Sequence, residues 1–363
     1  MSLTDEKKYK YQLVYEWIRA CIKDGTFTAG NKLYSENAIA EQFKISRLTV
    51  RKAIENLESE GLIYKIRGSG TYVNDISKVV TKGTKKIGVI TTVLSDYLFT
   101  SIIRGIDTVI SENGYTMTLG MTNNLFQDER RVLKSIVESG VDGLIIETTK
   151  SALPNPNIDL FHKFDLMGIP YVFIHGYYKE LDPVYVVTKD KDCGTKAVEY
   201  LYSLGHKDIA CIFKSDDMQG LERFSGFTRG ITSFGLEIND NRLIWFATDG
   251  EEEIFTGENE NLLLEKIKGC TAIVCYSDLV AMLLIKFLNC HGVKVPEDVS
   301  VIGFDNWSVF HLSLINITTF DHPKEKLGQE AAKRLLQMIS TGKKTESLSM
   351  DMQMIVMDST AKI

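Results

Sequence analysis

Acidic, basic and aromatic residues recur at the ends of predicted strands beyond residue 86 of this 363-residue chain. The residues that follow a predicted strand are Asp96, Tyr97, Glu147, His175, Asp278 and Asp305, and Arg223 opens the next predicted helix. Carboxylates accept hydrogen bonds, a guanidinium donates several in a fixed fork, and an aromatic ring offers an apolar face. A pocket for a small polyhydroxylated molecule such as a monosaccharide needs these groups, so we expect them to line a ligand site.

The elements that carry these residues are apolar runs alternating with amphipathic stretches. The predicted strands are Ile87–Thr91, Thr116–Leu119, Gly143–Ile146, Tyr171–Ile174, Ile209–Phe213, Ala272–Cys275 and Val299–Ile302. The predicted helices are Ile102–Ser111, Glu129–Glu138, Thr195–Ser203, Phe224–Phe234 and Leu279–Cys290. This alternation is typical of parallel sheets covered on both faces. We therefore predict a doubly wound α/β body in two lobes, with the ligand between them at the carboxyl ends of the strands.

Several of these residues also have a structural explanation. Asp190 and Asp192 open a predicted helix, where they more simply cap its N-terminus than contact a ligand. Asp305 is also suited to forming a turn, and a lone histidine such as His175 is more often structural than functional. Gly68-Ser69-Gly70 is not a dinucleotide fingerprint, because no helix follows it.

A second group of residues, between 35 and 59, predicts two short helices joined by a tight connection. Ser35 is a suitable N-cap for a helix over Glu36–Phe43, and Ser46 for a second helix that begins at Arg47. The core-facing stripe of the second helix consists of Val50, Ala53, Ile54 and Leu57. Arg47 and Arg51 are four residues apart and therefore share another face. This pattern is that of a helix-turn-helix, whose second helix enters the DNA major groove.

The next segment changes to a period of two residues. Leu62 to Arg67 and Thr71 to Val73 read as strands around Gly68-Ser69-Gly70, so we predict a β-hairpin with Lys65 and Arg67 beside its turn. A solvated helix face would by itself explain Arg47 and Arg51, and an ordinary turn would by itself explain Gly68-Ser69-Gly70. Their order and spacing together favour a winged helix-turn-helix.

A helix over residues 10–23 should pack on the two helices of the helix-turn-helix. The buried face of this helix should carry Leu13, Trp17, Ile18 and Cys21. Tyr11, near its start, either reaches a DNA phosphate or packs at the rim of the head.

Composition sets limits on location and partners. The formal net charge is −6, but residues 1–75 carry +2 and the remainder −8, which fits local contact between the head and DNA. The six cysteines form no C-x-x-C pair, so we expect buried thiols rather than a metal site or disulfides. The N-terminus lacks an apolar signal segment and no run is long enough to span a bilayer, so we expect a cytoplasmic protein that does not enter membranes.

The head resembles the DNA-binding domain of the GntR family. The resemblance is carried by Leu33-Tyr34-Ser35-Glu36, by Ser46-Arg47-Leu48-Thr49-Val50-Arg51-Lys52-Ala53 and by Gly68-Ser69-Gly70-Thr71-Tyr72-Val73. It implies DNA contacts from Ser35, Arg47, Thr49, Arg51 and the wing tip, with Glu36, Ser46 and Lys52 in the same segments. The family usually has proline at the position of Tyr34.

The body is similar to the effector domain of the LacI/GalR family. The segments that carry this likeness are Ile87–Ile90, Asp142–Ile146, Leu204–His206, Arg223–Phe227, Val295–Asp305 and Thr318-Thr319. The likeness implies a two-lobed fold of the type I periplasmic-binding-protein class, and ligand contacts from Arg223, Asp278 and often Asp305. His175 stands where that family often has aspartate.

Together these features predict a winged helix-turn-helix head at 1–74, a linker at 75–85 and an effector-binding body at 86–363. By the resemblance, lobe one holds about 86–187 and 320–342, and lobe two about 188–319 and 343–363. A GntR-type head on a LacI/GalR-type body resembles the arabinose repressors. This implies a homodimer that binds operator DNA, takes L-arabinose as its effector, and has no cofactor, metal or enzymatic activity. The alternatives are a head fused to an enzyme-like pyridoxal phosphate domain, or a repressor that responds to another small metabolite.

Overall fold

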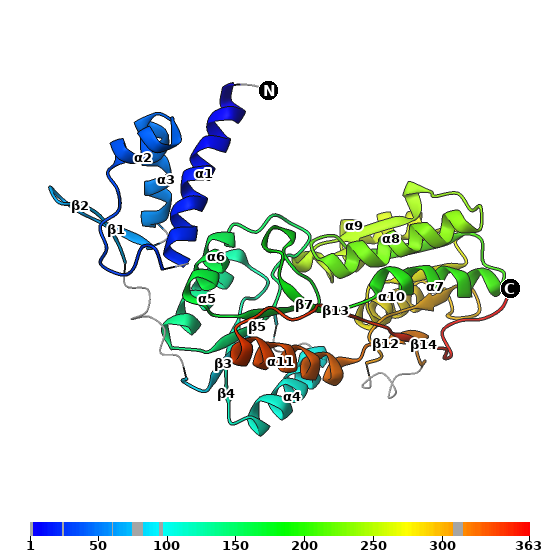
Figure 1. The fold of residues 1–363 in the computed structure, drawn as a ribbon. Helices are drawn as coiled ribbons and strands as arrows, with labels where there is room; N and C mark the ends of the chain where they lie inside the picture. Colours follow the sequence, from blue (N-terminus) through cyan, green and yellow to red (C-terminus); the bar gives the residue numbers. More distant parts are fainter. Residues whose placement is uncertain (1–2, 24, 60, 75–82, 94–96, 308–314) are drawn as a thin grey trace.

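The computed structural model describes residues 3–23, 25–59, 61–74, 83–93, 97–307 and 315–363. An N-terminal head lies at one end of the molecule, next to the first of two lobes, and the second lobe lies at the other end (Figure 1). The two-lobed α/β body with a winged head is therefore confirmed.

The head contains the predicted helices and hairpin. Its elements are α1 (Leu3–Lys23), α2 (Glu36–Phe43), α3 (Arg47–Ser59), β1 (Ile63–Ile66) and β2 (Gly70–Val73). Ser35 caps α2 by accepting a hydrogen bond from the amide of Ala38 over 3.2 Å. Ser46 accepts one from the amide of Thr49 over 3.2 Å, so both predicted caps are confirmed.

The first helix differs from its prediction. It begins at Leu3 rather than at residue 10, and Leu13 is 45% exposed, so its predicted burial is wrong. Val14 lies in the core instead, together with Ile18 and Cys21. Both stripes satisfy the helical period, and packing against α3 selects the one that contains Val14.

Lobe one has a parallel sheet in the order β13-β7-β6-β5-β3-β4. Its strands are β3 (Lys86–Thr91), β4 (Thr116–Met121), β5 (Gly143–Glu147), β6 (Tyr171–Ile174), β7 (Val184–Thr188) and β13 (Leu348–Met350). Helices α4 (Tyr97–Glu112) and α11 (Lys324–Thr341) cover one face. Helices α5 (Phe126–Glu138) and α6 (Ile158–Met167) cover the other, and η2 (Lys179–Leu181) precedes β7.

Lobe two has a parallel sheet in the order β11-β10-β8-β9. Its strands are β8 (Ile209–Lys214), β9 (Leu243–Phe246), β10 (Ala272–Cys275) and β11 (Ser300–Ile302). Helices α7 (Asp190–Ser203) and α8 (Met218–Ser233) pack on one face. Helices α9 (Glu258–Ile267) and α10 (Asp278–Cys290) pack on the other. The short helices η3 (Asp240–Arg242), η4 (Thr248–Gly250) and η5 (Glu253–Phe255) surround β9.

The chain passes between the lobes after β7, along β12 (Thr319–Asp321), and between β13 and β14 (Gln353–Ile355). Strands β12 and β14 pair with each other. The C-terminal segment 343–363, which was assigned to lobe two, is in fact divided. Leu348 pairs with Val186 in the sheet of lobe one, whereas Ser359 bonds to Val301 in lobe two.

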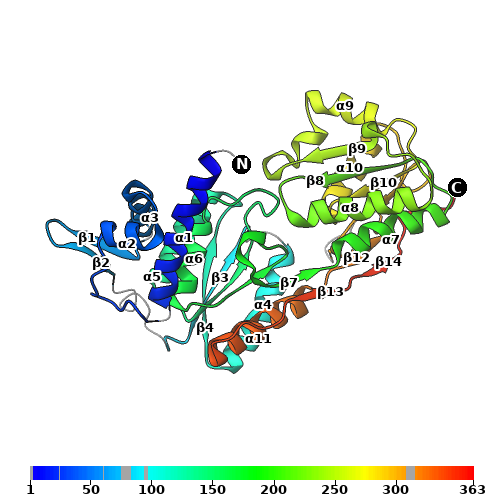
Figure 2. The same cartoon turned by 45° about the horizontal axis from the view of Figure 1, so that its top comes forward.

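The head contacts lobe one along α1 and α6, which lie side by side in both views (Figures 1 and 2). The Nη2 of Arg19 donates to the carbonyl oxygen of His162 over 3.4 Å, and Leu166 packs against the core of the head. Residues 75–82 of the expected linker lie outside the described part of the chain.

Among the described residues, none of the helices combines the length and the apolar character that a membrane span requires. All six cysteines are free thiols, and five of them are buried as expected. Cys290 is exposed, which corrects the expectation for that residue.

Candidate functional site

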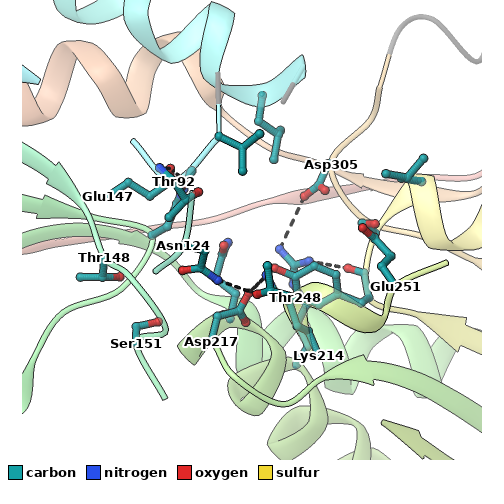
Figure 3. A pocket seen from close by; sticks show the side chains of 18 of the residues that line it. Thr92, Asn124, Glu147, Thr148, Ser151, Lys214, Asp217, Thr248, Glu251 and Asp305 are labelled. Carbon is teal, nitrogen blue, oxygen red and sulfur yellow. Dashed lines mark hydrogen bonds and ion pairs between the residues drawn. The ribbon is translucent and has the colours of Figure 1, made fainter. Parts of the chain in front are cut away.

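A cavity of about 370 Å³ lies between the two lobes, where the parallel strands of both sheets end (Figure 3). Lobe one contributes Thr92, Asn124, Glu147, Thr148, Ser151 and His175 to its wall. Lobe two contributes Lys214, Asp217, Arg223, Thr248, Glu251, Tyr276, Asp305 and Trp307. The cavity therefore occupies the position that the doubly wound fold predicts for a ligand.

Glu147 is the last residue of β5, and both oxygens of its carboxylate have hydrogen-bond partners. Its Oε2 accepts from the hydroxyl of Thr91 at 2.8 Å and from the amide and hydroxyl of Thr92 at 2.8 and 2.9 Å. Its Oε1 lies 2.8 Å from Nδ1 of His175. Burial alone would raise the pKa of Glu147, but His175 and the amide of Thr92 outweigh it and lower the pKa to about 2. The carboxylate is therefore ionised and fixed in direction.

His175 follows β6 and has a φ of 62°, a left-handed conformation that is uncommon for residues other than glycine. Its ring packs edge-on against His322, with 5.1 Å between the ring centroids. Burial, and then the charge of His175, hold the pKa of His322 well below its ordinary value. His322 follows β12, so this ring pair joins the wall of the cavity to a crossover between the lobes.

Arg223 is buried within α8, rather than at the start of a helix as predicted. Its Nε donates to Oδ1 of Asp190 over 2.8 Å, and its Nη2 lies 3.5 Å from Oδ1 of Asp305. The guanidinium carbon lies 4.4 Å from the ring centroid of Phe304 and 5.0 Å from that of Tyr276. Burial works against its charge, but Asp190 and Asp305 raise the pKa of Arg223 above its ordinary value. The guanidinium is therefore a fixed cation beside the cavity.

The close approach of α7 and α8 brings Arg223 to Asp190. Glycines at the contact between the two helices allow this approach. A Cβ at Gly194 would overlap the carbonyl oxygen of Arg223, and a Cβ at Gly226 would overlap the carbonyl oxygen of Lys191. The predicted capping role of Asp190 and Asp192 is wrong, because Lys189 occupies the N-cap position of α7.

Each of the two aspartates has another partner. Besides Arg223, Asp190 accepts from the hydroxyl of Thr188. Asp192 pairs with Arg229 at 2.8 Å.

Lys214, Asp217 and Tyr276 form a second polar group in the wall that was not predicted. The hydroxyl of Tyr276 donates to Asp217 over 2.5 Å, and Nζ of Lys214 lies 3.5 Å from the same carboxylate. Burial would lower the pKa of Lys214, but Asp217 and Asp216 raise it above its ordinary value. The signal that pointed to Glu147 also applies here, because Lys214 directly follows the predicted strand Ile209–Phe213.

Asp278 is not among the described residues that line the cavity, in contrast to the prediction. Its Oδ1 accepts from the hydroxyl of Thr319 at 2.7 Å and its Oδ2 from the amide of Trp307 at 2.9 Å. Burial, and then the charge of Asp305, raise its pKa to about 8. Asp278 therefore supports the segment that presents Trp307 to the cavity. Asp96 and the side chain of Tyr97 lie outside the described part of the structure.

On the head, the two arginines of α3 lie on one exposed face as predicted. Nε of Arg47 and Nη2 of Arg51 both donate to Oε2 of Glu36, over 2.8 and 3.2 Å. Nζ of Lys52 lies 5.0 Å from the ring centroid of Tyr11. Tyr11 is half-buried and packs against the core of the head, which supports its packing explanation.

The wing also matches its prediction. The turn between β1 and β2 includes Arg67 and Gly68, whose φ of 78° suits glycine. The hydroxyls of Ser69 and Tyr72 lie 2.6 Å apart, and Nζ of Lys65 lies 2.7 Å from Glu58.

Tyr34, which replaces the usual proline, stacks on Trp17 with 6.3 Å between the ring centroids. An aromatic contact therefore fixes the approach to α2 at this position.

Comparison with known proteins gives one family match in the head and one in the body. Residues 10–73 match the family described as bacterial regulatory proteins, gntR family, and residues 198–360 match the periplasmic binding protein-like domain. Among solved structures, a complex of the transcriptional regulator CelR with cellobiose has a TM-score of 0.69 at 22% identity, over 86% of this chain and 90% of that one. At 22% identity, this likeness shows a shared fold and nothing further.

Curated relatives match nearly the whole chain. It is 36% identical over 363 residues to the arabinose metabolism transcriptional repressor of Halalkalibacterium halodurans, with 97% of each chain covered. It is 38% identical over 334 residues to that of Geobacillus stearothermophilus, with 91% of each covered. Because these relatives are repressors and the body matches a binding-protein domain, the alternative of an enzyme-like domain is wrong. The chain belongs to the family of the arabinose metabolism transcriptional repressors and is a DNA-binding, sugar-responsive repressor.

Proposed function

We propose that L-arabinose binds in the interlobe cavity and that its binding releases this repressor from operator DNA. The observation that carries the proposal is the convergence of two fixed groups on one cavity. Glu147 with His175 projects from lobe one, and Arg223 with Asp305 projects from lobe two. The curated relatives are named for arabinose metabolism, which supports the choice of this sugar.

The chemistry of the wall suits an uncharged sugar. Sugar hydroxyls both donate and accept, so they match carboxylates on one side and a guanidinium on the other, and Trp307 offers a ring to the C–H face. The charges of Lys214 and Arg223 are already met by neighbouring carboxylates. Glu251 is a further carboxyl group in the same wall. A phosphorylated sugar would meet these carboxyl groups and is therefore disfavoured.

The head supplies the DNA contacts in this proposal. Arg47 and Arg51 face outward from α3, where a major-groove helix presents its base-reading residues. Two heads on a two-fold homodimer would contact two half-sites of a pseudo-palindromic operator in the cytoplasm. Sugar binding need favour the released arrangement by only about 1–3 kcal/mol per site.

Calorimetry with L-arabinose, D-xylose, D-ribose and D-galactose tests the assignment of the sugar. Fluorescence anisotropy on an operator fragment selected from genomic DNA tests the release. We expect L-arabinose to bind more tightly than the other sugars and to dissociate the complex. Micromolar binding of another sugar without binding of L-arabinose would disprove the assignment.

A further inference from the structure

One edge of the cavity is closed by a hydrogen bond that runs from one lobe to the other. Asn124 lies in the loop after β4 of lobe one, and Thr248 begins η4 of lobe two. The Nδ2 of Asn124 donates to Oγ1 of Thr248 over 2.5 Å (Figure 3). Asn124 is 3% exposed, and the bond is partly buried.

Both partners are oriented by other contacts. Asn124 has a φ of 54°, a conformation that asparagine tolerates. Its Oδ1 accepts from the amide of Lys150 over 2.8 Å, which turns its NH₂ group toward lobe two. The hydroxyl of Thr248 donates to Oδ2 of Asp216 over 2.7 Å, so its oxygen is left to accept from Asn124. Asp216 in turn lies 3.9 Å from Nζ of Lys214 in the wall of the cavity.

A second contact between the lobes lies beside the first. The loop after β5 reaches the turn before α8, where the hydroxyl of Ser151 accepts from the amide of Met218 over 2.8 Å. The amide of Ala152 donates to the carbonyl oxygen of Asp216 over 3.4 Å. Two loops of lobe one are therefore bonded to a single patch of lobe two, at the edge of the cavity.

We propose that these bonds form an interlobe latch, and that Asn124 and Thr248 are positioning residues for the sugar response. The bond between them spans the cleft, so it is lost when the lobes separate, and its free energy adds to that of the sugar in favour of the closed arrangement. The two residues thereby set the affinity for the sugar through lobe closure. This inference rests on the proposed binding of a sugar in the cavity.

Paired variants test the latch. Asn124→Gly removes the amide and keeps the positive φ, and Asn123→Gly is its matched control. Asn123 has a φ of 49° and bonds to Asp128 within lobe one. Thr248→Val removes the hydroxyl, whereas Thr248→Ser keeps it.

Calorimetry and stopped-flow dissociation of L-arabinose provide the measurements. We expect Asn124→Gly and Thr248→Val to weaken sugar binding about 3- to 10-fold, as loss of one hydrogen bond does, with faster dissociation. Asn123→Gly and Thr248→Ser should match the parent. The variant with both Asn124→Gly and Thr248→Val should bind L-arabinose no more weakly than the weaker single variant.

Equal sugar affinity of Asn124→Gly and Asn123→Gly, or losses that simply add in the double variant, would overturn the latch. Should the parent bind no L-arabinose, the proposed function fails and the latch is judged by urea unfolding of the sugar-free protein. There, the effects of Asn124→Gly and Thr248→Val on the free energy of unfolding should be non-additive if the bond exists, and additive if it does not.

Discussion

Arg223 and Asp190 form a buried ion pair, 2.8 Å between Nε and Oδ1, at the point where the chain first passes from lobe one to lobe two. Asp190 begins α7 immediately after that crossover, and Arg223 projects from α8. The ion pair therefore connects the segment that follows the crossover to a residue in the wall of the cavity. Both side chains have lost most of their contact with water, so each depends on the other for its charge to be met.

Removing this guanidinium should therefore destabilise the fold. We expect Arg223→Ala to lower the free energy of unfolding by about 3–5 kcal/mol, because the buried carboxylate of Asp190 loses its cation. Arg229→Ala is the control, since Arg229 is also in α8 and pairs with Asp192 at 2.8 Å on the exposed surface. That change should cost about 0–1 kcal/mol. Equal losses in urea unfolding would show that burial does not govern the Arg223 pair.

A milder change at the same position separates sugar binding from stability. Arg223→Lys keeps the charge but loses the planar fork. We expect the variant to bind operator like the parent, and to bind L-arabinose more weakly by about 1–3 kcal/mol, because a buried hydroxyl loses its donor. Operator anisotropy with and without sugar measures both effects. Release at the parent's sugar concentration would exclude contact between Arg223 and the sugar.

On the head, Arg51→Ala should weaken operator binding by about 1–3 kcal/mol if the guanidinium reads a base. Arg131→Ala removes the same charge from α5 in lobe one and serves as the control for net charge. Anisotropy titrations at a fixed salt concentration compare the two. Equal operator affinities for the two variants would remove Arg51 from the set of DNA contacts.

The raised pKa of Asp278 should make the stability of the fold depend on pH. Its pKa is raised to about 8 in the folded protein, so the folded state holds a proton that the unfolded chain releases near pH 4. Stability should therefore fall as the pH rises from about 4 to about 8. Asp278→Asn mimics the protonated form, and Thr319 can accept from its amide by reversing its hydroxyl.

We expect the Asp278→Asn variant to lose less stability than the parent between pH 5 and pH 8, as measured by urea unfolding at each pH. Parallel pH profiles for the two proteins would contradict the raised pKa.

The sequence was sufficient for features encoded by neighbouring residues. Ser35 and Ser46 cap their helices, and Arg47 and Arg51 share a face, because cap chemistry and helical period are local. Glu147 was found because it directly follows an apolar strand.

Contacts between distant segments were not predicted. Asp190 was interpreted as a cap because its partner lies in another helix, and the bond from Asn124 to Thr248 joins separate lobes. Strand β13 has three residues, too few for a period of two to be recognised. Asp278 was placed in the wall because it follows the predicted strand Ala272–Cys275 and matches a ligand residue of the LacI/GalR family. In the structure its neighbours Ser277 and Leu279 line the cavity instead.

The place of β13 in the sheet of lobe one determines the order in which a growing chain can fold. The head is complete once residue 73 has left the ribosome, and domains generally fold as units in the order of their synthesis. Lobe one, however, begins at β3, and β7 lacks the second of its two neighbouring strands until Leu348–Met350 has been made. A chain cut short before that strand would carry a finished DNA-binding head on an unfinished sensor.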